Sequence, residues 1–168
     1  MSVITGAGKI IKWEPHGGSG GQEFDDYHQF KSAPAIHQLQ VNVGETLDHL
    51  VVSYSFAGDF YPIQHGESNF GTPHPPFILD RPEVLTKVEA WFHTFDGTRE
   101  LGGLRFTVTD FNVGRTRTSD LYASRDVRGR PADYVFDATK VIGGPGVIIA
   151  FCGRQGLFVN ALGVYVQV

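Results

Sequence analysis

The sequence predicts an all-β protein, and three observations support that prediction. The dominant hydrophobic period along the chain is two, which places alternate side chains on opposite faces of a strand. Clusters of turn residues interrupt the apolar runs at short spacing. The 168 residues include 21 glycines and 9 prolines, a content that is typical of many short strands joined by turns.

Three segments show the alternation in its strictest form. In residues 38–43, 104–109 and 161–168, every second residue is leucine, valine or phenylalanine, and the residues between them are mostly polar or small. Each of these segments is predicted to be a strand with one buried face and one wetter face.

Weaker versions of the pattern predict further strands at Lys9–Trp13, Leu50–Phe56, Phe77–Leu79, Leu85–Phe92, Tyr134–Asp137 and Val147–Cys152. The segment Arg81–Phe92 has some helical character, but its β-branched residues and short length favour a strand. Turn clusters at residues 43–45, 56–59, 95–97 and 143–146 separate the predicted strands. Many short strands with frequent turns indicate a sandwich, barrel or prism.

Length and composition limit the classes of protein to which the chain can belong. No linker divides the sequence, so a single domain over residues 1–168 is expected. The net charge of −4 gives no reason to expect nucleic acid or an anionic membrane as a partner. No segment approaches the ~18 apolar residues that a membrane span requires. Membrane insertion is therefore not expected.

Cys152 is the only cysteine, which excludes an intrachain disulfide and a thiolate metal cluster. It lies in an apolar run and is expected to be a buried, inert thiol. The seven histidines show no metal-ligand spacing, so no metal or cofactor is expected. Met1–Ile10 has no signal-peptide pattern. We expect a cytoplasmic protein, with export by an unconventional route left open.

Two features occur twice along the chain. Residues 44–52 and 156–164 both read Gly-x-x-x-Asp/Asn-x-Leu-x-Val, and the glycine-rich segment 17–21 has a counterpart at 66–71. Two different repeats in one chain indicate internal pseudosymmetry.

The segment Gly17–Gly21 is a candidate ligand-binding loop, because glycine lets a ligand approach the backbone closely and exposes N–H groups. A flexible loop without a ligand is the alternative for such a glycine run. A phosphate loop is excluded, since no Lys-Ser/Thr pair and no helix follow.

Five segments in the same order resemble the jacalin-related lectins, and together they cover nearly the whole chain. They are the glycine loop leading into Phe24-Asp25-Asp26, residues 47–54 (family pattern V-D-x-I-x-V-x-Y), 71–79, 104–110 (L-x-F-x-T-N) and 146–166 (G-x-I-x-G-F-x-G-x-x-G-x-x-L-D-A-I-G-V-Y-V). The resemblance implies a β-prism of three four-stranded Greek-key sheets with pseudo-threefold symmetry. The period-two runs and the internal repeats agree with this fold.

In that family the sugar lies between the glycine loop and a Gly-x-x-x-Asp loop. Carried over by position, this first site comprises Gly21, Gly156, Leu157, Phe158 and Asn160. Backbone N–H groups would donate to sugar hydroxyls, and Phe158 would add an apolar wall. The family usually has Asp where this chain has Asn160. The loss of a charged acceptor predicts binding that is weaker by about tenfold, or a changed preference among hydroxyls.

The repeat also predicts a second site at Gly44, Glu45, Thr46, Asp48 and Gly71. Some family members use the equivalent loop with two acidic residues, and here the loop keeps the carboxylate of Asp48. The facing loop runs from His65 to Gly71, where Glu67, Asn69 and Phe70 replace glycines and would crowd or reshape the site. The alternative is that Asp48 only satisfies a loop N–H.

The resemblance implies reversible binding of mannose- or glucose-type glycans without catalysis, and multivalency makes a homodimer plausible. Galactose-binding relatives carry a free amino group, made by processing, at the position of Gly21, and nothing indicates such processing here. One alternative is a β-prism protein-interaction module whose sugar site is weakened by Asn160. The other is a small β-rich glycoside hydrolase, for which the sequence marks no carboxylate pair.

Overall fold

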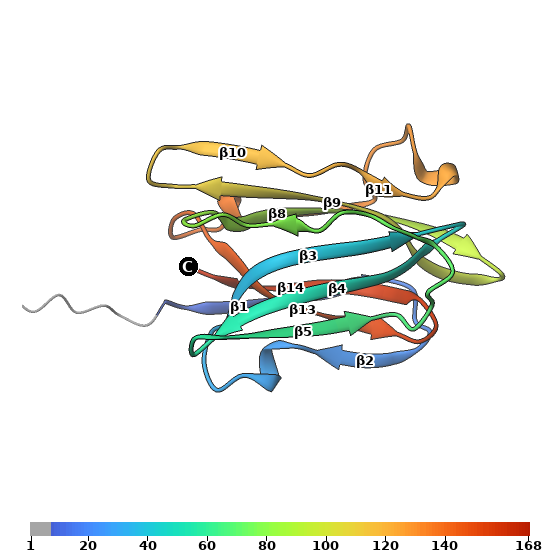
Figure 1. Cartoon of the computed structure of the whole chain (residues 1–168), viewed down its shortest axis with the longest axis horizontal. Coiled ribbons are helices and arrows are strands. Elements are labelled where there is room, and N and C mark those ends of the chain that lie inside the picture. Colours follow the sequence, from blue (N-terminus) through green and yellow to red (C-terminus); the bar gives the residue numbers. More distant parts are fainter. Residues whose placement is uncertain (1–7) are drawn as a thin grey trace, which may run out of the picture.

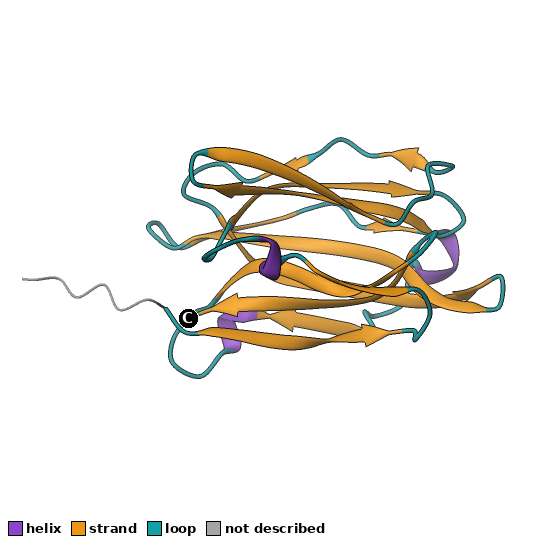
Figure 2. Cartoon of the chain, turned by 90° about the horizontal axis from the view of Figure 1, so that it is seen from below, coloured by secondary structure: helices purple, strands orange, loops and turns teal. Residues whose placement is uncertain are grey.

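The structure, a computed structural model, describes residues 8–168 as three antiparallel sheets around one core (Figure 1). Figure 2 shows that most strands run along the long axis of the molecule. Helical structure in the described residues is limited to short 3₁₀ turns, η1 (Tyr27–Gln29), η2 (Arg125–Val127) and η3 (Ala138–Lys140). The all-β prediction is therefore confirmed. Residues 1–7, which hold most of the segment tested for a signal peptide, lie outside the described residues.

The first sheet unites the two ends of the chain. Its strand order is β1 (Ile10–Gly17), β14 (Val159–Gln167), β13 (Val147–Gln155) and β2 (Gln22–Asp25). The second sheet has the order β10 (Arg115–Thr118), β9 (Thr98–Asp110), β8 (Val84–Phe95) and β12 (Tyr134–Asp137).

The third sheet has the order β5 (Asp59–His65), β4 (Leu47–Phe56), β3 (Ala35–Val43) and β6 (Thr72–Pro73). Two edges are broken, because β7 (Phe77–Ile78) also pairs with β3 and β11 (Tyr122–Ala123) also pairs with β9. When β6 and β7 are counted as one edge strand, and β10 and β11 as another, every sheet is four strands wide. The order β5-β4-β3-β6 is a Greek key, as the β-prism prediction requires.

All the strands predicted from hydrophobic alternation are present, and the ambiguous segment at 81–92 is extended from Val84 onward, where it begins strand β8. The strands that sequence analysis missed are β2, β5, β6, β10 and β11. They are edge strands or fragments of edges, and most of their residues are half-buried or exposed. An edge strand lacks the buried face that creates alternation.

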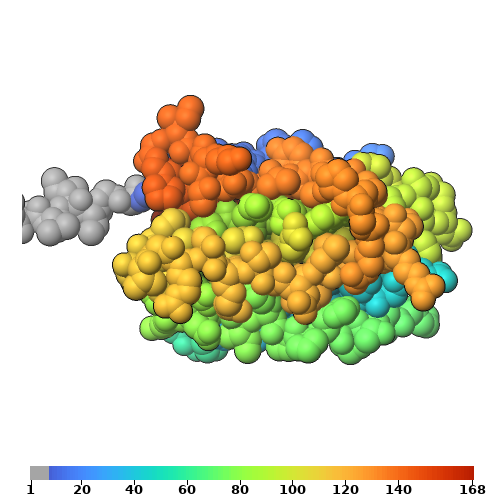
Figure 3. All heavy atoms as spheres, turned by 90° about the horizontal axis from the view of Figure 1, so that it is seen from above, coloured from blue at the N-terminus to red at the C-terminus, as the bar shows by residue number. Residues whose placement is uncertain are grey.

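The segment between residues 115 and 130, in which hydrophobic alternation predicts no strand, contributes to the second sheet and to a small apolar cluster. Arg115–Thr118 pair with β9 as strand β10, and Arg117 donates to the Glu83 carboxylate at 2.7 and 3.0 Å. Beyond β10, Val127 of η2 packs with Trp91 in a small separate apolar cluster. Figure 3 shows this segment, in orange, spread across one face of the molecule.

The main core draws its largest fully buried side chains from all three sheets. Phe151 comes from the first sheet, Phe106 and Phe136 from the second, and Tyr54 from the third. Cys152 is 1% exposed, and burial raises the pKa of its thiol to about 12. This confirms the prediction that Cys152 is buried, and the raised pKa disfavours the reactive thiolate form.

A buried polar cluster ties the first sheet to the third. Asp26 is fully buried and accepts hydrogen bonds from the hydroxyl of Tyr54 at 2.6 Å and from His65 Nε2 at 2.8 Å. The Tyr54 hydroxyl in turn accepts from the N–H of Phe151 at 3.0 Å. Because His65 ends strand β5, this cluster fixes the start of the loop that runs to Gly71.

The internal repeat corresponds to equivalent hairpins. Each hairpin has two register shifts, and the one nearer the connecting loop leaves Asn160 as an extra residue in the β13–β14 pairing and Asp48 in the β3–β4 pairing. The third hairpin, β8–β9, has Gly102 as the extra residue at the corresponding shift. A side chain there would meet Val127 at 2.9 Å and His93 at 3.0 Å. The third repeat therefore carries no polar side chain at this position.

Candidate functional site

The glycine loop and the C-terminal loop face each other at the first site. A Cβ atom on Gly21 would lie 2.6 Å from Oδ1 of Asn160 and 2.4 Å from the carbonyl oxygen of Gln155. Gly21 also has a φ of +70°, which favours glycine. The nearest atom to a Cβ on Gly156 would be the Cα of Gly21, at 3.8 Å. The structure thus brings Gly21, Gly156 and Asn160 together, as the sequence predicted.

The second site repeats this arrangement with a carboxylate. A Cβ atom on Gly71 would lie 2.0 Å from Oδ2 of Asp48, and one on Gly44 would lie 3.1 Å from the same atom. Asp48 is 4% exposed, and its Oδ1 accepts from the Ser68 hydroxyl at 2.5 Å. Its Oδ2 has no hydrogen-bond partner among the described residues. The described hydrogen bonds of the Asp48 side chain therefore include none from a loop N–H, which was the alternative role for this residue.

A cavity of about 470 Å³, here called the second-site cavity, lies in front of Asp48. It is lined by Gly44, Glu45, Thr46, Asp48, Ser68, Phe70, Gly71, Phe95, Asp96, Leu157 and Phe158. All five residues predicted for the second site are among them. Leu157 and Phe158, which the resemblance assigns to the first site, also line this cavity.

The β13–β14 loop, which carries residues predicted for the first site, therefore forms part of the wall of the second-site cavity. Backbone N–H groups of Glu67 and Ser68 donate to the carbonyl oxygen of Leu157, both at 2.9 Å. These bonds hold the facing loop of the second site against the loop of the first site. Gly21 and Gly156 also border a separate cavity of about 530 Å³, which reaches Gly66 and Glu67.

The family model described as "Jacalin-like lectin domain" matches residues 13–165. The chain belongs to the jacalin-like lectin family. It is 28% identical over 158 residues to an agglutinin from Castanea crenata, which covers 91% of this chain and 45% of that relative. The chain spans less than half the length of the curated relatives it matches.

Solved structures of jacalin-like lectins share the fold. Malaysian banana lectin is 24% identical, with a TM-score of 0.73 over 94% of this chain and 98% of that one. A mannose-specific jacalin-related lectin from Morus nigra is 22% identical, with a TM-score of 0.71 over 99% of this chain and 100% of that one. These likenesses confirm the predicted β-prism.

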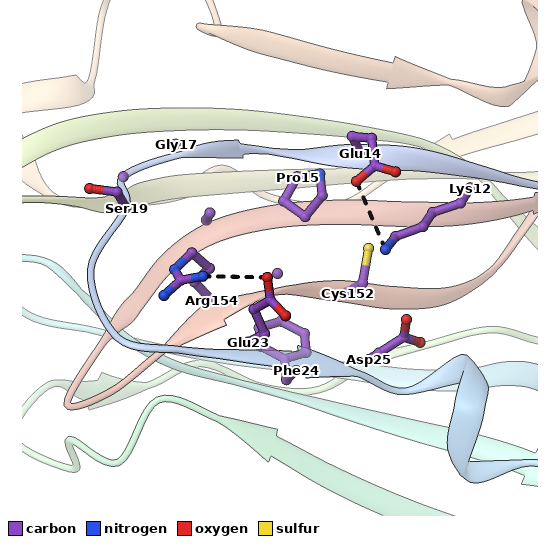
Figure 4. Close-up of a pocket in the computed structure, with 13 residues that line it drawn as sticks. Lys12, Glu14, Pro15, Gly17, Ser19, Glu23, Phe24, Asp25, Cys152 and Arg154 are labelled. Carbon is purple, nitrogen blue, oxygen red and sulfur yellow. Dashed lines mark ion pairs between the residues drawn. The ribbon is translucent and has the colours of Figure 1, made fainter.

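In this jacalin-like lectin, Arg154 positions the glycine loop, a role that sequence analysis missed. Its Nε donates to the carbonyl oxygen of Gly20 at 2.9 Å, and one terminal nitrogen donates to that of Gly21 at 2.8 Å. Arg154 lies in a groove of about 370 Å³ across the first sheet. Figure 4 shows its side chain extending from β13 toward Glu23 of β2, with 3.6 Å between the charged atoms. The family motif holds no arginine at this position to reveal that role.

The β8–β9 hairpin supplies a wall that was predicted only as a turn. Phe95 packs edge-on against Phe158, with 5.5 Å between ring centroids. Asp96 follows at the tip, and burial together with the charge of Asp96 raises the pKa of the nearby Glu100 carboxyl to about 7. The hairpin therefore adds both an aromatic face and negative charge to the second-site cavity.

Thr46 links the second-site loop to that hairpin. Its hydroxyl lies 2.7 Å from Nε2 of His93, whose Nδ1 lies 2.7 Å from a carboxylate oxygen of Asp126. The residue types resemble a hydrolytic triad, but Thr46 is 1% exposed and its hydroxyl donates to the carbonyl oxygen of Leu101 at 3.2 Å. The hydroxyl is therefore committed to the backbone, and the three side chains brace the loop.

Residues 8–168 contain no helix with the length and apolar character needed to cross a membrane. Within the same residues, no group of three or more His, Cys, Asp or Glu side chains is arranged to hold a metal ion.

Proposed function

We propose that this jacalin-like lectin binds mannose- or glucose-type glycans reversibly, without catalysis, at the first and second sites. The observation that carries the proposal is the repeated pairing of a glycine with a bulged polar side chain, Gly21 with Asn160 and Gly71 with Asp48. A pyranose needs several donors and acceptors in a fixed shallow cup, with an apolar wall for its C–H face. Phe158 beside these loops offers such a wall.

The second site is expected to bind more tightly than the first. Asp48 has a carboxylate whose Oδ2 is buried and has no hydrogen-bond partner among the described residues, whereas Asn160 has a neutral amide. Hydrogen bonds to charged groups contribute about 1.5–3 kcal/mol, against about 0.5–1.5 kcal/mol for neutral ones. Phe70 was expected to crowd the second site. The second-site cavity is nevertheless open, with a volume of about 470 Å³.

Names of relatives support a mannose-type ligand. The Morus nigra lectin is described as mannose-specific and in complex with mannose, and artocarpin was solved with methyl-α-mannose. Support for a non-catalytic role comes from the family, which is a lectin family. The proposal also keeps the expected homodimer, because two copies would strengthen weak single-site binding through avidity. Sedimentation velocity tests that part, and a single monomeric species at all concentrations would reject it.

Glycine-to-alanine variants test the sites one at a time by calorimetry with methyl α-mannoside and methyl α-glucoside. Gly21→Ala places a methyl group against Asn160, and Gly71→Ala places one against Asp48. Each variant should lose one site and keep the other. Gly58→Ala is the matched control, because Gly58 has a φ of +86° but open space around its Cβ position. It shares the backbone strain of Gly21→Ala without touching either site.

The outcomes separate the candidate functions. Binding that is reduced by either variant and unchanged in the control supports the lectin sites. Absence of binding to both glycosides by the unmodified protein would reject the proposal and favour the protein-interaction module. Turnover of a reporter glycoside would contradict the non-catalytic part.

A further inference from the structure

The charged residues that line the second-site cavity are all acidic. The described residues that line it include three carboxylates, Glu45, Asp48 and Asp96, and no lysine or arginine. The nearby Arg99 lies outside the cavity lining, with its guanidinium 5.4 Å from the ring centroid of Phe92. The field inside the cavity therefore favours a ligand with positive charge.

Asp48 gives this charge a specific point of attachment. It is 4% exposed, it lines the cavity, and its Oδ2 has no hydrogen-bond partner among the described residues. A buried carboxylate oxygen without a donor is costly. A charged N–H donor would satisfy it more strongly than a neutral hydroxyl, because charge-assisted hydrogen bonds are about twice as strong.

The walls of the cavity also suit a cation. Phe70, Phe95 and Phe158 line it, and Phe70 is 95% exposed at the rim. Aromatic faces carry partial negative charge and attract cations within about 6 Å. The influence of Asp96 is already visible within the protein, because its charge contributes to the raised pKa of Glu100.

We infer that the second site selects a hexose that bears a protonated amine over the same hexose in neutral, N-acetylated or acidic form. This inference rests on the proposed glycan binding and narrows it to a class of ligand. The N–H of Gly44 already donates to the carbonyl oxygen of Thr46 at 2.9 Å, so among the described hydrogen bonds the N–H of Gly71 is the one left for a sugar hydroxyl. This favours an amino sugar over the side chain of a basic peptide.

The test is a calorimetric series at about pH 6, where an amine is largely protonated. The probes are methyl α-glucoside, 2-amino-2-deoxyglucose, N-acetylglucosamine, glucuronate and Nα-acetyl-lysine amide. The amino sugar should bind about tenfold more tightly than the neutral glycoside at low salt, the effect of one favourable charge contact. Salt should reduce the difference.

Variants connect the preference to the cavity. Asp96→Asn should lower the preference for the amino sugar roughly threefold, because it removes one of the three charges. Asp59→Asn is the matched control, since Asp59 lies at the other end of the β4–β5 pair and the same charge is lost away from the cavity. It should leave the preference unchanged.

The failure of this inference is distinguishable from the failure of the proposed function. Equal affinity for the neutral and amino sugars, with both bound, overturns the inference and leaves glycan binding intact. Binding of none of the sugars overturns both. Binding of the lysine amide as tightly as the amino sugar overturns the assignment to a glycan.

Discussion

Replacing Glu100 by glutamine should stabilise the protein above neutral pH and have little effect in acid. Glu100 is 6% exposed, and its Oε2 has no hydrogen-bond partner among the described residues. Burial, with a further contribution from the charge of Asp96, raises the pKa of Glu100 from its ordinary value of 4.5 to about 7. Each pKa unit corresponds to about 1.36 kcal/mol, so ionising Glu100 in the folded protein costs up to roughly 3 kcal/mol.

The sign of the pH dependence follows from which state binds the proton more tightly. The folded protein holds the Glu100 proton more tightly than the unfolded chain, so this stabilisation is complete below about pH 4.5 and is lost as the pH rises to about 7. Glutamine keeps the size of the side chain and never ionises. The variant should therefore match the unmodified protein near pH 4 and exceed it by up to roughly 3 kcal/mol near pH 8.

The assay is urea unfolding followed by tryptophan fluorescence at several pH values, analysed as the free energy of unfolding. Glu89→Gln is the matched control with the opposite sign. Hydrogen bonds from Arg105 at 2.7 and 2.8 Å lower the pKa of Glu89, so its loss should destabilise the protein above the ordinary carboxyl range. Stability curves of Glu100→Gln and the unmodified protein that stay parallel from pH 4 to 8 would refute the reasoning.

Three further predictions concern the first site and the core. Arg154→Ala should weaken first-site binding of methyl α-mannoside by about fivefold or more, because the glycine loop loses two charge-assisted hydrogen bonds. Second-site binding should persist, and a loss of binding at both sites would indicate misfolding instead. Asn160→Asp should strengthen the first site by about tenfold by calorimetry, and unchanged affinity would show that this side chain does not accept from the sugar. Tyr54→Phe should cost about 1–3 kcal/mol in urea unfolding, since it leaves Asp26 with one donor fewer, and a neutral effect would argue against a structural role for the cluster.

The central strands of each sheet could be predicted from the sequence, whereas only some of the edge strands could. Of the edge strands, β1, β7 and β12 were predicted, and β2, β5, β6, β10 and β11 were not. Strands β3, β9 and β14 have a buried face, so their alternation is visible without a structure. Strand β5 contains Pro62 and has mostly exposed residues, and β10 was hidden in a charged segment. Edge strands are defined by the neighbour they pair with, which local sequence does not specify.

The candidate site likewise contains residues that could be predicted from the sequence and residues that could not. Gly21, Asn160, Gly71 and Asp48 were predicted because each pair belongs to a repeated local motif. The contributions of Arg154 and of the β8–β9 hairpin depend on how separate sheets close against each other. Leu157 and Phe158 were predicted for the first site, but they line the second-site cavity and do not line the cavity beside Gly21 and Gly156.

The loop after His65 is joined by hydrogen bonds to the carbonyl oxygens of Gly156 and Leu157. These bonds fix the position of the second site relative to the first, which determines how one glycan could reach both. They place both sites side by side at one end of the prism, where neighbouring branches of a single glycan antenna can reach them together. Under the proposed function, the two sites of one chain would therefore bind branches of the same antenna. Clumping of glycan-coated particles would require at least two copies held back to back.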